Sequence, residues 1–385
     1  MVGSVSPWMD DELVMLQEQV SRFITTELAP RAAGWEQDRQ VDAASWKKMA
    51  EAGLLGASIP EAYGGSGGHL GHEAVIQREL TLAGLGGSMA VAHGIHSCIV
   101  GHYIMAYGTE EQKQRWLPAM VRGDLKGAIA MTEPGTGSDL QAVRTTAAPD
   151  AGGYRLNGQK TFISNGQTAN LILVVARIGD GAGASALSLV AVETDKADGF
   201  RRGRNLEKLG MHGQDTSELF FDDVRVPAQN VLGGALGQGF GQLMSQLAWE
   251  RMTIALNGVA SMQKAVELTA EYARERSAFG RPLMDFQNTQ FVLADAKTQA
   301  TVGQHFVDTL MVKLLEGTLD ATTAAMAKLW VSETAFKVID ACQQVFGGYG
   351  YMVEYPIARM FADARVARVY GGSSEIMKLI IARSL

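Results

Sequence analysis

The stretch AMTEPGTGSDL at residues 130–140 follows a short apolar run and combines hydroxyl side chains, small residues and backbone donors in one turn. Gly135 and Gly137 permit close approach of the backbone to a ligand, while Thr132 and Ser138 can exchange hydrogen bonds with it. A loop of this kind after a strand suits a flavin and its pyrophosphate, although an ordinary glycine-containing hairpin loop has the same composition. The stretch also marks a change in the pattern of the chain.

Upstream of this loop, apolar residues recur at helical spacing. The pattern covers residues 10–30, 44–55, 72–85, 88–107 and 110–121. Residues 80–109 carry no Asp, Glu, Lys or Arg, but six glycines and three histidines interrupt them, which favours a buried helix over a membrane span. The sequence therefore predicts an N-terminal α-helical domain over residues 1–126 and no membrane span.

Downstream of the loop, the period changes to that of strands. LILVVARI (171–178), LSLVAVE (187–193) and SELFFDDVRVP (217–227) are rich in β-branched and apolar residues and are bounded by turn formers. Asn157 and Gly158 favour left-handed backbone, which predicts a hairpin turn at this pair. We expect a middle domain over residues 127–235, built as an antiparallel or β-barrel-like sheet.

After VLGGALGQGFG (231–241) the helical period returns and continues almost to the end. It is interrupted at residues 280–282, 317 and 347–350, where glycine and proline occur. The sequence predicts a C-terminal four-helix bundle over residues 236–385, and an α+β multidomain fold for the whole chain.

The composition limits the possible partners. With 385 residues and 46% hydrophobic residues, the chain can bury a core large enough for an enzyme. A formal net charge of −7 argues against nucleic acid as a partner, because phosphate binding needs clustered Lys and Arg. The two cysteines have no CxxC spacing, and the N-terminus shows no targeting pattern, so we expect a reducing, cytoplasmic setting.

The segment TEPGTGSD (132–139) resembles the first signature of the acyl-CoA dehydrogenase family, and NGQKTFISNG (157–166) resembles a strand that follows it in the family. The resemblance implies FAD as the cofactor. The residues that would contact it here are Met131, Thr132, Gly137, Ser138, Phe162 and Ser164. The family more often has Trp at Phe162, and Phe keeps the stacking face without the indole donor.

Two later segments agree with the resemblance. RERSAFGRPLMDFQ (274–287) is similar to the family segment that reaches the FAD of a neighbouring subunit, which implies a homo-oligomer, either a tetramer or a dimer. Residues 344–385 are similar to the second family signature. The cofactor-binding residues implied by the two segments are Arg276, Phe279, Gln287, Gln344, Gly348, Tyr370 and Ser373.

The catalytic base is displaced relative to much of the family. Many members carry a glutamate between Tyr and Gly before the last helix, and this chain reads VYGGSS (369–374), with Gly371 in that place. LAWERMTIA (247–255) resembles the helix on which long-chain and isovaleryl-type members place their glutamate, and Glu250 fills that position. The resemblance implies Glu250 as the base and Ser138, Arg251, Tyr370 and Gly371 as substrate residues.

Other readings of these residues stay open at this point. Glu250 could be a solvated helix carboxylate, and Arg251 could pair with a surface carboxylate. The pairs His69/His72 and His93/His96 have a spacing seen in metal sites, but no carboxylate or cysteine stands at ligand spacing, so we expect no metal.

The expected reaction is the α,β-dehydrogenation of an acyl-CoA thioester to trans-2-enoyl-CoA. Glu250 would abstract the α-proton, flavin N5 would accept the β-hydride, and an electron-transferring flavoprotein would take the electrons, in fatty-acid or branched-chain catabolism. The substrate would be a medium, long or branched acyl-CoA. The alternatives are a flavin-dependent oxidase or monooxygenase on the same fold, and a flavoprotein that binds nucleic acid.

Overall fold

The computed structural model of the protein describes residues 5–179 and 183–385. Its first part consists of helices and begins with α1, which Asp10 caps by accepting a hydrogen bond from the Leu13 amide at 2.9 Å. The helices are α1 (Asp11–Phe23), α2 (Ala32–Asp38), α3 (Ala43–Glu51), α4 (Leu70–Leu80), α5 (Met89–His93), α6 (His102–Tyr107) and α7 (Glu110–Val121). The predicted helical N-terminal part is confirmed.

The segment without charged residues forms helices that are interrupted by two π-helical stretches, Thr81–Leu85 and Gly94–Gly101. The second of these joins α5 to α6 without a break. Most side chains in it are buried within the protein. Among the described residues, no helix combines the length and the apolar character needed to cross a membrane.

A seven-stranded sheet forms the middle of the chain, with the order β1-β4-β2-β3-β7-β6 and β5 paired to β4. Its strands are β1 (Gly127–Ala130), β2 (Thr146–Asp150), β3 (Gly153–Ser164), β4 (Leu171–Arg177), β5 (Leu187–Glu193), β6 (Phe200–Asn205) and β7 (Thr216–Pro227). Most pairs are antiparallel, as predicted, but β1 runs parallel to β4. The sheet is therefore mixed, with the glycine-containing loop of residues 131–139 leaving the end of β1.

The predicted hairpin turn at Asn157 and Gly158 is wrong. Both residues lie inside β3, where the register against β7 shifts at a bulge, and the turn into β3 instead follows Asp150. At Gly158, with φ of 155°, an added Cβ would lie 2.4 Å from Thr145 Oγ1, so close packing explains this glycine. The Asn157 side chain accepts a hydrogen bond from the Asp223 amide at 2.8 Å.

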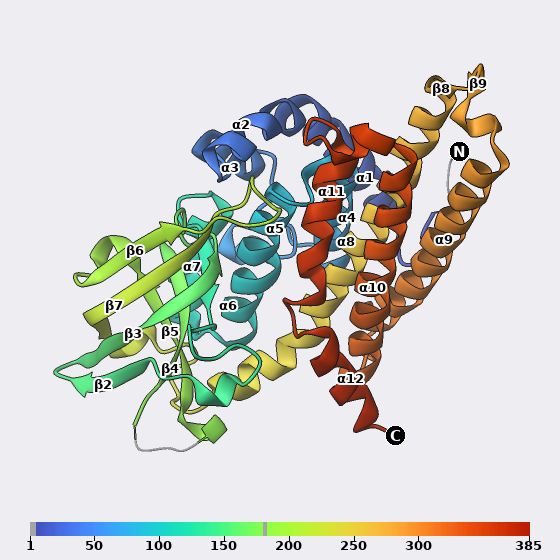
Figure 1. Ribbon diagram of the computed structural model, residues 1–385. Helices are drawn as coiled ribbons and strands as arrows, with labels where there is room; N and C mark the ends of the chain where they lie inside the picture. Colours follow the sequence, from blue (N-terminus) through green and yellow to red (C-terminus); the bar gives the residue numbers. More distant parts are fainter. Residues whose placement is uncertain (1–4, 180–182) are drawn as a thin grey trace.

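The last part is helical again and is dominated by the 37-residue helix α8 (Gly239–Glu275). It also contains α9 (Gln287–Leu315), α10 (Ala321–Val345), α11 (Pro356–Ala364) and α12 (Ser374–Ala382), with a short hairpin of β8 (Ser277–Ala278) and β9 (Arg281–Pro282) between α8 and α9. Figure 1 shows the hairpin at one end of the bundle and α12 at the other.

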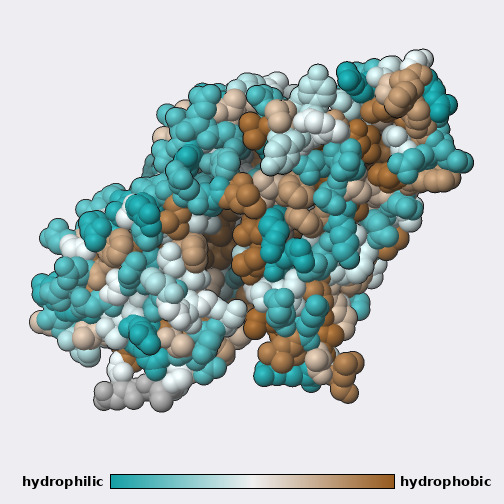
Figure 2. Space-filling view, in the orientation of Figure 1, coloured by the Kyte–Doolittle hydropathy of each residue, from teal (hydrophilic) through white to brown (hydrophobic). Residues whose placement is uncertain are grey.

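Helices α5 and α6 lie between the sheet and the C-terminal bundle, while α2 and α3 lie at the top of the view (Figure 1). One core cluster joins α1 and α4 to α8, α9 and α10, and a second joins α6 and α7 to β4 and β5. Figure 2 shows a hollow lined by hydrophobic residues between the sheet and the bundle. The middle helices thus fix the position of α8 relative to the loops of the sheet.

Candidate active site

Glu250 lies in the first third of α8 and is 6% exposed, so it is not a solvated helix carboxylate. Its Oε1 accepts a hydrogen bond from the Tyr103 hydroxyl of α6 at 2.8 Å. The neighbouring Trp249 indole donates to the Cys98 carbonyl at 2.9 Å and fixes the rotation of α8 at this point. Burial raises the pKa of Glu250 to about 7, although the hydrogen bond from Tyr103 and the charge of Arg251 oppose the shift.

Arg251 is also buried, with 4% exposure. It does not pair with a surface carboxylate: its Nη1 donates to the Ala321 carbonyl at 3.4 Å, and its Nε is buried without a partner among the described residues. A buried guanidinium nitrogen without a partner is uncommon, and it leaves a donor available to a ligand.

Gly371 lies against the same face of α8. An added Cβ at Gly371 would lie 2.3 Å from Cδ1 of Ile254, which follows Glu250 by one helical turn. Gly371 and Gly372 both have positive φ, 65° and 91°, and Lys328 on α10 donates to the Gly372 carbonyl at 2.6 Å. The two glycines therefore let the chain pass close to α8, and α10 holds it there.

The rest of this loop is fixed at the start of α12. The Ser373 hydroxyl caps α12 by accepting a hydrogen bond from the Ile376 amide at 3.4 Å, and Ser374 donates to Glu333 at 2.7 Å. Glu375 occupies the first turn of α12, where its charge favours the helix dipole, and is exposed. Tyr370 remains partly exposed beside Gly371.

The loop after β1 is held against β3 by a buried ion pair. Lys160 on β3 lies 2.9 Å from Glu133 and also donates to the Met131 carbonyl at 3.0 Å. The Thr161 amide donates to the Thr132 carbonyl at 2.9 Å. Burial lowers the pKa of Lys160 to about 8, against the effect of Glu133. These contacts leave the hydroxyls and glycines of the loop on the outer side.

The exposed side of this loop fits a flavin. Gly137 and Ser138 are exposed, and a Cβ added at Gly135 would meet no atom within 4 Å. On the adjoining strand, Phe162 is 67% exposed and its φ of 59° lies in the left-handed region, while Ser164 is half-buried. An apolar ring held outside the core in strained backbone is expected where a planar partner covers it.

The remaining predicted cofactor residues lie at the other end of the bundle. They are Arg276, Phe279, Gln287, Gln344 and Gly348. Phe279 is 96% exposed at the tip of the β8–β9 hairpin, and the Arg276 guanidinium lies 5.5 Å from the centre of the Tyr349 ring. Arg276 and Gly348 line an open cavity of about 460 Å³. The structure therefore divides the predicted cofactor residues into two sets, which Figure 1 shows far apart.

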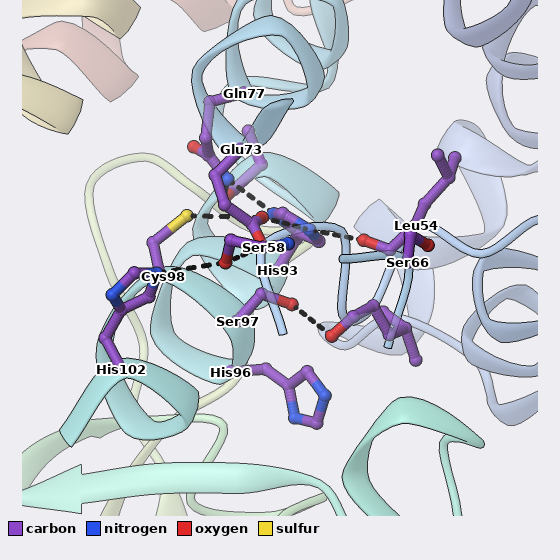
Figure 3. Close-up of polar contacts among 12 residues, drawn as sticks. Leu54, Ser58, Ser66, Glu73, Gln77, His93, His96, Ser97, Cys98 and His102 are labelled. Carbon is purple, nitrogen blue, oxygen red and sulfur yellow. Dashed lines mark hydrogen bonds and ion pairs between the residues drawn. The ribbon is translucent and has the colours of Figure 1, made fainter. Parts of the chain in front are cut away.

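A buried polar cluster that the sequence did not predict lies among the N-terminal helices (Figure 3). Ligand atoms of Glu73, His93 and Cys98 lie within 4.8 Å of one another, so a carboxylate and a thiol do stand beside one of the histidine pairs. The expectation that His93 has no such neighbours is wrong. Glu73 lies on α4 and Cys98 lies on the π-helical segment that follows α5, and the packing of these helices brings both side chains to His93.

Both ring nitrogens of His93 are already engaged. Nε2 donates to the Leu54 carbonyl at 2.8 Å, and Nδ1 accepts from the Gln77 amide at 2.8 Å. Glu73 accepts two hydrogen bonds from Ser58, through its amide and its hydroxyl (Figure 3). Burial lowers the pKa of His93, in keeping with a neutral ring. The cluster is thus a hydrogen-bond network that ties these helices together.

The other histidine pair has a different structural role. His69 caps α4 by accepting from the Gly71 amide, and His72 accepts from the His69 amide, both at 3.1 Å.

Comparisons with known proteins agree along the whole chain. Models of the N-terminal, middle and C-terminal domains of acyl-CoA dehydrogenases match residues 10–124, 128–224 and 237–385. The mitochondrial long-chain specific acyl-CoA dehydrogenase of Sus scrofa is 43% identical over 373 residues, which are 96% of this chain and 86% of the relative.

Solved structures give the same result. An acyl-CoA dehydrogenase from Geobacillus kaustophilus superposes with a TM-score of 0.95 at 42% identity, over 99% of each chain. A glutaryl-CoA dehydrogenase from Mycobacterium smegmatis, solved in complex with FADH2, superposes with a TM-score of 0.91 at 28% identity, over 99% of this chain and 96% of the other.

Proposed function

The chain belongs to the acyl-CoA dehydrogenase family, whose members are FAD-dependent enzymes, and on that premise we propose that Glu250 is the base that removes the α-proton of a bound acyl-CoA. The observation that carries the proposal is the buried carboxyl of Glu250 on the face of α8 that Gly371 approaches through Ile254. Gly371 itself has no side chain to act as a base, so a carboxyl on this face takes over that role.

The environment of Glu250 suits proton abstraction. The α-proton of a thioester is a very weak acid, so the base must be stronger than an ordinary carboxylate and the carbonyl must be polarised. A pKa of about 7 makes Glu250 a better base and leaves about half of it ionised at neutral pH. The Gly371 amide is the donor we propose for the thioester carbonyl, since glycine keeps its N–H.

Residues of this chain bind and orient the reactants in the proposal. Met131, Thr132, Gly137, Ser138, Phe162 and Ser164 hold the flavin, together with Tyr370 and Ser373. FAD, when bound, supplies the acceptor for the hydride that leaves the β-carbon. Glu250 receives the α-proton, and the electron pair of that C–H bond forms the new double bond. Arg251, with its free buried Nε, Ser138 and Tyr370 contact the substrate.

A long acyl chain is the substrate that we propose first. The relative at 43% identity is named for long-chain substrates, and the hollow between the sheet and the bundle is lined by hydrophobic residues (Figure 2). We further propose that an electron-transferring flavoprotein reoxidises the enzyme in fatty-acid catabolism.

Two copies of the chain share each FAD in this proposal. Glu250 and Arg276 stand 26 residues apart along and just beyond α8, which corresponds to about 40 Å at the rise of an α-helix. One set of cofactor residues lies near each end, so a single copy does not surround one cofactor. A homo-oligomer, a tetramer or a dimer, brings the hairpin end of one copy to the flavin loop of another.

Replacing Glu250 with Gln tests the base. We expect kcat to fall about 100- to 10,000-fold on acyl-CoAs from four to eighteen carbons, with an electron-acceptor dye, because general-base catalysis is lost while size is kept. The flavin absorbance of the purified variant should match the parent. Glu375→Gln, an exposed carboxyl in α12, is the matched control and should keep its activity.

Near-full activity of Glu250→Gln on every chain length would show that another group is the base. The same preparations separate the alternative function. A dehydrogenase with bound product reoxidises slowly in air, whereas an oxidase or monooxygenase consumes O₂ in every turnover.

A further inference from the structure

The Glu250 carboxyl accepts a hydrogen bond from Tyr103, a residue of the N-terminal helices. Tyr103 belongs to α6 and Glu250 to α8, and the two side chains meet at 2.8 Å between the hydroxyl and Oε1. Tyr103 is 1% exposed and is packed in the core cluster between the helices and the sheet. Its position is therefore fixed by a core that α6 and α7 form mainly with β4 and β5.

Two further contacts join the same faces of α6 and α8. Gln246, one turn before Glu250, donates to the Tyr107 hydroxyl at 3.2 Å, and the rings of His102 and Trp249 lie 6.0 Å apart. Neither contact reaches the Glu250 carboxyl. Among the described residues Oε2 of Glu250 accepts no hydrogen bond, while Oε1 is taken by Tyr103.

We infer that Tyr103 is a positioning residue for the base: its hydroxyl fixes Oε1 of Glu250, so that Oε2 is the oxygen presented to the substrate α-carbon. This inference rests on the proposed function of Glu250. A carboxylate that is free to rotate must be ordered in each turnover, whereas one held at Oε1 is already oriented.

The hydrogen bond also sets the strength of the base. Burial, and then the charge of Glu250, raise the pKa of Tyr103 well above its ordinary range, so the phenol stays protonated and always donates. A donor stabilises the ionised carboxylate and limits the rise in the pKa of Glu250 that burial causes. Tyr103 thus limits the fraction of the base that burial leaves protonated at neutral pH.

The other groups around Glu250 do not replace this donor. Tyr107 of α6 faces Tyr103 and Gln246, Arg251 is on α8 itself, and Lys328 of α10 faces Arg251 and donates to Gly372. Arg251 acts on the carboxylate by its charge alone.

The test is Tyr103→Phe in the FAD-loaded enzyme, which keeps the ring and removes the hydroxyl. A hydrogen bond to a charged group corresponds to a pKa shift of about one to two units, so the rising limb of kcat against pH should move upward by that amount. At pH 7 kcat should fall about 5- to 50-fold, with KM little changed. Tyr107→Phe, one turn away, is the control and should leave the midpoint unchanged.

A midpoint in Tyr103→Phe equal to that of the parent would overturn the inference. A second variant protects the test against misfolding: 3-fluorotyrosine at position 103 keeps the hydroxyl but makes it a stronger donor, so the midpoint should move downward, and no movement counts against the inference. Infrared titration of the Glu250 carboxyl, identified by its loss in Glu250→Gln, reports the same shift without turnover. That measurement stays decisive even if another group proves to be the base.

Discussion

The two ends of α8 present opposite surfaces. Near its start, Glu250 and Arg251 are ionisable side chains that are almost completely buried, with hydrogen-bond partners on α6 and α10. Just beyond its other end, Phe279 is an apolar side chain that is almost completely exposed, with a φ of 53° that favours glycine. One end thus places an ionisable side chain in the core, and the other places an apolar side chain in solvent, and both environments are energetically unfavourable for these side chains.

The difference indicates which surface a single chain buries by itself and which surface it leaves for a second molecule to cover. Burying a carboxyl without a full ion pair lowers stability, and in the proposed function the raised pKa of Glu250 serves the reaction. An exposed aromatic tip lowers solubility, and such a tip is typical of a surface that a second molecule covers. In the proposed function, the first end is the reaction site and the second is half of a binding site.

The largest expected effect concerns the buried end. The pKa of Glu250 is about 7 in the folded protein against 4.5 for an ordinary glutamate, which represents the unfolded chain, so the folded state binds more protons between these values and stability falls as pH rises from 4.5 to 7. Glu250→Gln removes this effect and should stabilise the protein by up to about 3 kcal/mol at pH 8. Denaturant unfolding of parent and variant at pH 5 and pH 8 measures the change.

The gain should shrink toward zero as pH approaches 4.5, because the parent carboxyl is then protonated as well. Glu375→Gln gives no gain at either pH, since that carboxyl is exposed. A variant less stable than the parent at pH 8 would show that the ionised carboxyl is well accommodated, and the contrast between the two ends of α8 would disappear.

A substitution in the hairpin at the other end of α8 should weaken FAD binding and leave the stability of the fold almost unchanged. Arg276→Ala removes a proposed contact to the FAD pyrophosphate, worth about 1.5–3 kcal/mol for a charged hydrogen bond, so FAD retention should weaken about 10- to 100-fold. Flavin fluorescence during dilution measures the release. Arg281→Ala, in the same hairpin and stacked 4.1 Å from the centre of the Phe286 ring, is the control and should retain FAD.

Equal FAD retention in parent and Arg276→Ala would mean that the hairpin does not reach a cofactor. The apo forms should unfold at the same denaturant concentration, because the Arg276 side chain is exposed.

The smallest effect concerns the contact between Gly371 and α8. Gly371→Ala should destabilise the protein by about 1–2 kcal/mol, because φ is 65° and the new Cβ meets Ile254 Cδ1 at 2.3 Å. Ile254→Ala should relieve the steric part, so the double variant is more stable than the sum of the single changes predicts. Gly135→Ala is the control, since a Cβ there meets nothing within 4 Å. Strictly additive changes would place Gly371 away from the base.

The order of helices, strands and helices was predictable because periodicity is local. Glu250 could be singled out because a motif that resembles the family's surrounds it, whereas its contact with Tyr103 could not be predicted, since Tyr103 lies 147 residues away in the chain. The Asn157–Gly158 turn failed for a related reason: the pairing of β3 with β7 along twelve residues outweighs the preference of one dipeptide. Glu73, His93 and Cys98 were not grouped because only the packing of two helices brings them together.

Ile254 has a consequence for how such enzymes diverge. It fills the space toward which a side chain at position 371 would point, on the row of α8 that also bears Glu250. A carboxyl side chain at position 371 would need a smaller residue at position 254 and a left-handed backbone at 371, so a change of base between the two segments involves at least these two positions together.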